Sequence, residues 1–156
     1  MKDAIYFTNE ALARFIAAQG RNVAKVVCHL WQNNLNPSAP LEIIDNVELH
    51  FTDGNKITIG CNADGTALDA YEYDAKAVAK QLKEEFNDKI KLFAIDASTT
   101  GMWKDIIGKD LIMVRLTKDG EYYLADTLIL DFGKEDKREI TMNPEDGIII
   151  DFYEEI

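Results

Sequence analysis

A strand–turn–strand pattern that occurs twice constrains this chain more than any other feature of its sequence. From Val47 to Ile59, apolar and polar residues alternate on both sides of an Asp-Gly-Asn turn, which is typical of a β-hairpin. A related pattern returns about eighty residues later, from Leu128 to Met142. The chain therefore has a large antiparallel β component, and the recurrence indicates that either a scaffold or a site is doubled.

Four short segments of the first half match four segments of the second half in the same order. The first-half segments are Gly20–Val23, Asp45–Phe51, Ile57–Ile59 and Asp64–Glu72, and their counterparts are Gly108–Leu111, Asp126–Phe132, Ile140–Met142 and Asp146–Glu154. These matches predict an internal duplication of a four-stranded unit, with repeats at about 14–73 and 102–156. A helix–strand segment, residues 74–101, is expected to bridge them.

Two helices are predicted beside the strands. Thr8 is suited to cap a helix at about 9–19 that ends at Gly20, and Asp74 is suited to cap a second at about 75–86. Apolar residues recur at helical spacing in both segments. The expected fold is therefore α+β: mainly antiparallel β with about eight or nine strands, two helices, and one domain over residues 1–156.

The composition argues against several classes of protein and of binding partner. The net charge of −11 argues against binding to nucleic acid or to anionic membranes, which both require a basic surface, but it permits a basic protein partner. No apolar run approaches the ~20 residues of a membrane helix. The N-terminus is a poor match to a secretion signal, and Cys28 and Cys61 are too few for a disulfide framework. We therefore expect a cytoplasmic protein.

The negative charge is concentrated in the matching hairpin regions. Residues 39–75 contain eight acidic side chains and one lysine, and residues 121–156 contain eleven acidic and three basic ones. A functional acidic face explains this concentration. Solvation alone also remains open, because strand faces and turns are where polar residues have to lie.

Strand alternation predicts an acidic, tyrosine-bearing stripe in each half. If Leu68 and Ala70 face the core, the outward residues are Asp69, Tyr71 and Tyr73. If Ile150 and Phe152 face the core, the outward residues are Asp151, Tyr153 and Glu155. Tyrosine among carboxylates suits protein recognition, although cross-strand packing on a half-exposed sheet explains the same pattern.

The strand-like segments around Trp31 and the two histidines add one more group. His29, His50 and Trp31 are expected to project from a solvent-facing side, where Trp31 is a further candidate for partner binding. Glu48 is the only nearby carboxylate, so no metal site is expected. The sequence contains no nucleophile elbow, phosphate loop, zinc-protease motif or dinucleotide-binding motif. We therefore expect neither an enzyme nor a cofactor.

Two functions from different classes fit these observations. Small, acidic chains without catalytic motifs, built from helices and antiparallel sheet, resemble as a class the immunity proteins that protect bacteria from secreted toxins. This resemblance implies an inhibitor that neutralises a basic toxin by occluding it. The alternative is a non-catalytic small-molecule-binding or structural domain of the cytoplasm, in which the acidic residues only solvate the surface.

Overall fold

A computed structural model of the protein describes residues 4–35, 38 and 41–154. The helical elements of this part are α1 (Asn9–Ala18), α2 (Ala75–Phe86) and a short 3-10 helix, η1 (Lys104–Ile106). Its strands are β1 (Val23–Asn33), β2 (Leu41–Phe51), β3 (Lys56–Cys61), β4 (Leu68–Tyr71), β5 (Ile90–Asp96), β6 (Met113–Arg115), β7 (Lys118–Asp119), β8 (Tyr122–Tyr123), β9 (Thr127–Asp131), β10 (Lys137–Asn143) and β11 (Gly147–Phe152).

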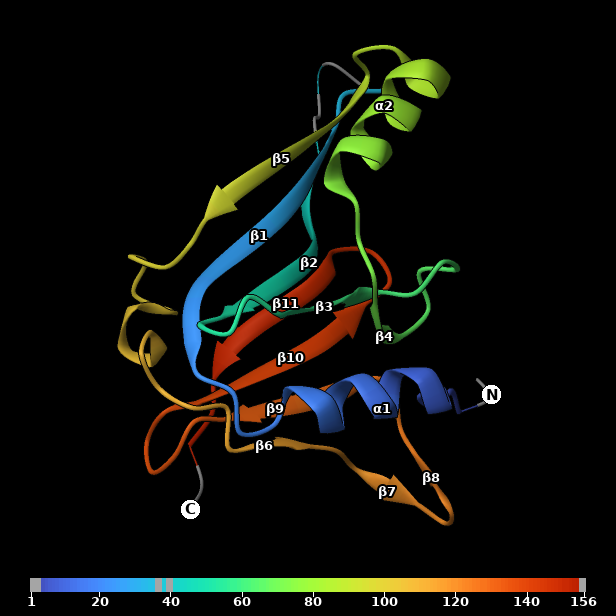
Figure 1. The fold of residues 1–156 in the computed structure, drawn as a ribbon. Helices are drawn as coiled ribbons and strands as arrows, with labels where there is room; N and C mark the ends of the chain where they lie inside the picture. The colour runs from blue at the N-terminus through green and yellow to red at the C-terminus, as the bar shows by residue number, and fades with distance from the viewer. Residues whose placement is uncertain (1–3, 36–37, 39–40, 155–156) are drawn as a thin grey trace.

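The predicted fold class is confirmed, because the chain forms an α+β structure with a mostly antiparallel, curled sheet (Figure 1). Both predicted helices are present with their caps. The Thr8 hydroxyl accepts the Ala11 N–H at 3.1 Å, and the Asp74 carboxylate accepts the N–H groups of Lys76 and Ala77. α1 packs against β3 and β4, whereas α2 packs against β5.

β2 is the strand that joins the two halves of the sheet. One edge of β2 pairs antiparallel with β1, which in turn pairs with β5. The other edge pairs with β3 and, at Ile44, in parallel with Gly147 of β11. The main sheet therefore runs β4-β3-β2-β11-β10-β9-β6, with β1 and β5 branching from β2.

Backbone hydrogen bonds close this sheet into a ring. Gly20 donates to the Leu111 carbonyl and Gly108 donates to the Val23 carbonyl, so the segments before β1 and β6 pair with each other. β6 continues the ring to β9. The interior is a single apolar cluster that includes Trp103, Leu49, Ile59, Leu130 and Ile140. Burial of these side chains is the main force that holds the curled sheet together.

The two halves share strand order and register. β1-β2-β3-β4 and β6-β9-β10-β11 are both antiparallel meanders, and the pairs Val47–Ile59 and Leu128–Ile140 are related by the same offset of 81 residues. The elements differ in size, because β1 has eleven residues and β6 has three. Similar topology does not demonstrate common origin. The internal duplication, with repeats at about 14–73 and 102–156, therefore stays a prediction.

Helices long and apolar enough to cross a membrane do not occur in the described part of the chain.

The contact between β2 and β11 requires glycine at position 147, and this requirement can be tested. The φ of Gly147 is +79°, and an added Cβ would lie 2.6 Å from the Ile44 carbonyl oxygen. We expect Gly147→Ala to lower the free energy of unfolding by about 3 kcal/mol, since backbone strain and a clash add together. Urea unfolding measures this loss.

Gly54 provides the matched control, because its φ is +88° but no atom would lie within 4 Å of an added Cβ. Gly54→Ala should therefore cost only about 1 kcal/mol, from the backbone conformation alone. Equal losses in the two variants would contradict the close approach of β11 to β2.

Candidate functional site

One extra residue in β2 shapes the face of the sheet that lies opposite the core. His29 of β1 lies opposite Asn46, but the next residue, Leu30, lies opposite Ile44. Asp45 is therefore the additional residue of a β-bulge, a feature that redirects side chains. Asn46 Nδ2 donates to Asp45 Oδ2 at 2.9 Å, so the two side chains lie together.

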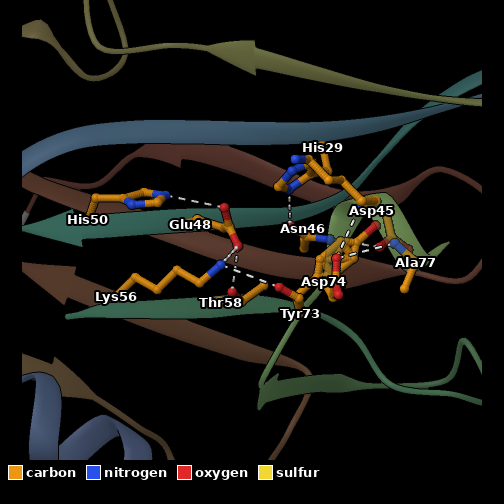
Figure 2. A network of polar contacts seen from close by, with 11 residues as sticks. His29, Asp45, Asn46, Glu48, His50, Lys56, Thr58, Tyr73, Asp74 and Ala77 are labelled. Carbon is orange, nitrogen blue, oxygen red and sulfur yellow. Dashed lines mark hydrogen bonds and ion pairs between the residues drawn. The ribbon is translucent and has the colours of Figure 1, made fainter. Parts of the chain in front are cut away.

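We call this surface of β1–β4 the polar face. It consists of the side chains of His29, Trp31, Asp45, Asn46, Glu48, His50, Lys56, Thr58, Asp69, Tyr71 and Tyr73. Figure 2 shows many of these side chains gathered along β2. Several are nearly inaccessible to solvent, including His29, Asn46, Glu48 and Thr58. Buried polar groups need hydrogen-bond partners, so each one on this face must be accounted for.

The Glu48 carboxylate has hydrogen-bond and ion-pair partners that compensate its charge, and we call such a carboxylate matched. Lys56 Nζ and Thr58 Oγ1 each donate to Glu48 Oε2 at 2.9 Å, and His50 Nε2 lies 3.2 Å from Oε1 (Figure 2). Burial alone would raise the pKa of Glu48. The hydrogen bonds from Lys56 and Thr58 and the charge of Lys56 outweigh that effect and hold the pKa below its ordinary value.

Asp45, another carboxylate of the polar face, is poorly matched. His29 Nδ1 donates to Asn46 Oδ1 at 2.8 Å, and the Asn46 amide donates in turn to Asp45. Among the described residues no lysine or arginine forms an ion pair with Asp45. Burial raises the pKa of Asp45, and its contacts with Asn46 and His29 compensate only in part.

Three aromatic residues, Trp31, Tyr71 and Tyr73, surround the region of Asp45 and Asn46. The Tyr73 ring centroid lies 4.8 Å from that of His29 and 6.1 Å from that of Tyr71. The Tyr71 hydroxyl lies only 2.7 Å from where a Cβ on Gly60 would be, so glycine leaves the room that this hydroxyl occupies. Burial and the charge of Asp45 raise the pKa of Tyr73 to about 12, against smaller opposing effects of the nearby Asn46 and Trp31 side chains.

Two buried polar groups of the polar face make no hydrogen bond of ordinary geometry. Trp31 Nε1 and the Tyr73 hydroxyl have almost no solvent exposure, and neither has a well-formed hydrogen-bond partner among the described residues, although Asn46 and Trp31 lie near enough to the Tyr73 hydroxyl to lower its pKa. Unpaired buried donors cost free energy, and in native proteins they often mark a place where another group binds.

A groove of about 650 Å³ adjoins the polar face. It lies between α1, the β2–β3 hairpin and the segment that follows β4, and its charged lining residues are Arg14, Arg21, Lys56, Glu72 and Asp74. Tyr71 and Tyr73 line it too. These two tyrosines therefore connect the groove with the polar face.

The structure places the predicted partner-binding residues in two separate regions. Asp69, Tyr71, Tyr73 and Trp31 share the polar face, all four half-buried. Asp151 is exposed and Tyr153 is half-buried at the end of β11, on the other side of the molecule from β4 (Figure 1). Glu155 lies outside the described residues. The two expected stripes therefore do not form one surface.

Two expectations about exposure are wrong. His29 was expected to face solvent but is only 3% exposed, because the Tyr73 ring covers it. Phe152 was expected in the core but is 59% exposed, because β11 ends there and the ring packs on the Arg138 guanidinium at 4.5 Å.

Sequence reasoning also missed Asp45, although a signal was present. The run Ile43-Ile44-Asp45-Asn46 places two apolar residues before two polar ones and so interrupts strict alternation. Such an interruption is the sequence trace of a β-bulge.

The remaining groups carry little reactivity. Burial raises the pKa of both Cys28 and Cys61 to about 11, so neither thiol is activated. Within residues 4–35, 38 and 41–154, no group of three His, Cys, Asp or Glu side chains has an arrangement able to hold a metal ion.

Comparisons with protein-family models, curated proteins and solved structures give no match to this chain.

The network around Glu48 predicts a pH-dependent contribution to stability. Glu48→Gln should lower the free energy of unfolding at pH 7 by about 2 kcal/mol, because the hydrogen bonds from Lys56 and Thr58 lose their charged acceptor. The folded-state pKa lies below the unfolded value of about 4.3, so this contribution is present above that pH and is lost as the pH falls further. Denaturation at several pH values measures it.

Glu72→Gln serves as the control, since Glu72 is exposed and makes no hydrogen bond or ion pair to a described residue. It should leave stability nearly unchanged. If Glu48→Gln cost as much at pH 3 as at pH 7, the electrostatic role of Glu48 would be refuted.

Proposed function

We propose that this chain is an acidic protein-binding inhibitor that neutralises a basic protein by covering its functional surface, in the manner of a bacterial immunity protein. The observation that carries the proposal is the gathering of Trp31, Tyr71 and Tyr73 on one face beside a groove. Tyrosine and tryptophan are the side chains most often found as energetic anchors of protein interfaces, because they offer large, rigid contact area.

The charge distribution supports a basic partner. The net charge of −11 attracts a cationic protein over a distance, and Asp69, Glu72 and Asp74 lie close to the aromatic residues in sequence, while the adjoining groove also carries Arg14, Arg21 and Lys56. Such attraction accelerates association, whereas buried aromatic contacts slow dissociation. In this proposal the protein acts in the cytoplasm of the bacterium that produces it.

The state of the aromatic hydroxyls agrees with binding rather than catalysis. Burial raises the pKa values of Tyr71 and Tyr73, so both hydroxyls stay protonated at neutral pH. They then act as neutral hydrogen-bonding groups and not as nucleophiles or bases.

The groove also favours a second candidate, a non-catalytic small-molecule-binding domain. Its volume of about 650 Å³ falls within the range of small-molecule sites, about 300–1,000 Å³. A metabolite that raised the melting temperature, with little dependence on salt, would favour this function over the inhibitor.

The inhibitor proposal is tested by capture followed by a functional assay. The immobilised chain is exposed to lysate of the organism that encodes it, at low and at high salt. We expect a basic protein that is retained at low salt, retained less at high salt, and inhibited by this chain in its own activity. A retained protein that stays fully active in the complex would contradict the proposal.

Kinetic variants then locate the interface. Asp69→Asn should lower the association rate roughly two- to fivefold at low salt, because it removes a steering charge from the polar face. Asp151→Asn removes the same charge from the distant end of β11 and is the matched control. If Asp151→Asn had the larger effect, the interface would lie on β11 and not on the polar face.

A further inference from the structure

We propose that Asp45, together with Tyr71, Tyr73 and Trp31, forms a binding site for a primary ammonium group, the group at the end of a lysine side chain. This inference rests on the proposed function and names the chemistry by which the polar face would hold its basic partner.

The first argument compares Asp45 with Glu48, two of the carboxylates of the polar face. Glu48 is paired with an ammonium group of the chain itself, because Lys56 Nζ lies 2.9 Å from Glu48 Oε2. Asp45 lies three residues away on the same strand, and among the described residues only the Asn46 amide donates a hydrogen bond to its side chain. A partly buried carboxylate without a counter-charge is unfavourable, so a cation from outside has a ready position there.

The second argument concerns acceptors for the ammonium hydrogens. An ammonium group donates three hydrogen bonds. Asp45 Oδ1 accepts no hydrogen bond from a described residue, since Asn46 donates to Oδ2. The Tyr71 hydroxyl, at 2.7 Å, and the Asp45 backbone oxygen both approach the position of a Cβ on Gly60, so this hydroxyl lies beside Asp45. The charge of Asp45 also raises the pKa of both Tyr71 and Tyr73. We infer that these hydroxyl oxygens supply further acceptors for an ammonium group bound at Asp45.

The aromatic rings strengthen the case for a cation. Aromatic rings such as those of Trp31, Tyr71 and Tyr73 carry negative potential on their faces, which favours a nearby positive charge. The Tyr73 hydroxyl is buried and makes no well-formed hydrogen bond to a described residue, so its oxygen can accept one from an ammonium group, whereas the Trp31 N–H is itself a donor and cannot bind that group directly. If a ligand oriented the Tyr73 hydroxyl, the Trp31 N–H beside it could donate to the same oxygen.

The site is open to approach. Asp45, Trp31, Tyr71 and Tyr73 are all half-buried, although Trp31 Nε1 and the Tyr73 hydroxyl themselves have almost no solvent exposure. Tyr71 and Tyr73 also line the groove, which carries Glu72 and Asp74 together with Arg14, Arg21 and Lys56. Asp45 lies outside the groove lining, so an ammonium group approaches it at the exposed part of its own side chain.

The test follows the two tryptophan indole N–H signals in an NMR spectrum of the full chain. Trp31 and Trp103 are the only tryptophans, and Trp31→Phe assigns the signals. The probe is n-butylammonium chloride, with sodium chloride of equal ionic strength as the control. We expect a saturable shift of the Trp31 signal and no shift of Trp103, which is buried in the core.

Two variants make the result specific. Asp45→Asn should weaken n-butylammonium binding at least tenfold, whereas Asp151→Asn, at the distant end of β11, should change it less than twofold. Asp45→Asn should also melt at the same or a higher temperature at pH 7, which excludes unfolding as the cause of lost binding. A Trp31 shift that sodium chloride reproduces, or that survives Asp45→Asn, would overturn the inference.

Further measurements identify the source of the ammonium group and test this inference separately from the proposed function. Nα-acetyl-lysine amide and a free diamine, 1,5-diaminopentane, are compared with the basic protein obtained by capture. If that protein bound Asp45→Asn as tightly as the unchanged chain, this inference would fail and the inhibitor proposal would stand. If the amines bound at Asp45 but no basic protein were retained, the ammonium site would stand and the inhibitor proposal would fail.

Discussion

The β-bulge at Asp45 is the constraint on which the arrangement of the polar face depends. Without the additional residue, the alternation of β2 would continue unbroken and Asp45 would not share a face with Asn46. β2 cannot shift freely to remove the bulge, because β1 pairs along one edge and β3 and β11 along the other. The closed ring of strands therefore fixes a charged side chain in a place where it is partly removed from water.

Asp45 and Glu48 illustrate how one strand, β2, supports both stability and binding. Glu48 is surrounded by Lys56, Thr58 and His50, so its charge contributes to the folded state. Among the described residues Asp45 has one amide donor and no cationic partner, so its charge opposes folding. Groups that reduce stability persist at functional sites more often than elsewhere, which is why the polar face, and not the exposed end of β11, is the better candidate for recognition.

Local features of the sequence predicted much of the fold. Thr8 and Asp74 marked both helices, and alternation marked most strands, because caps and two-residue periodicity act over short distances. Pairing of Gly20 with Leu111 and of Ile44 with Gly147 was not predictable, since it depends on the closed ring. Burial of His29 was missed because simple alternation treats one face as solvated, and here Tyr73 covers that face.

The central claim is that Glu48 of the polar face is a matched carboxylate and Asp45 an unmatched one, and titration of individual carboxyl groups by carbon-detected NMR tests it most directly. The account predicts that Asp45 titrates above the ordinary aspartate value of about 3.9 and that Glu48 titrates below the ordinary glutamate value of about 4.3. Shifts in opposite directions would establish the contrast between the two groups. If both titrated at their ordinary values, or Asp45 below its own, the polar face would contain no unmatched charge and the case for a cation site would fall.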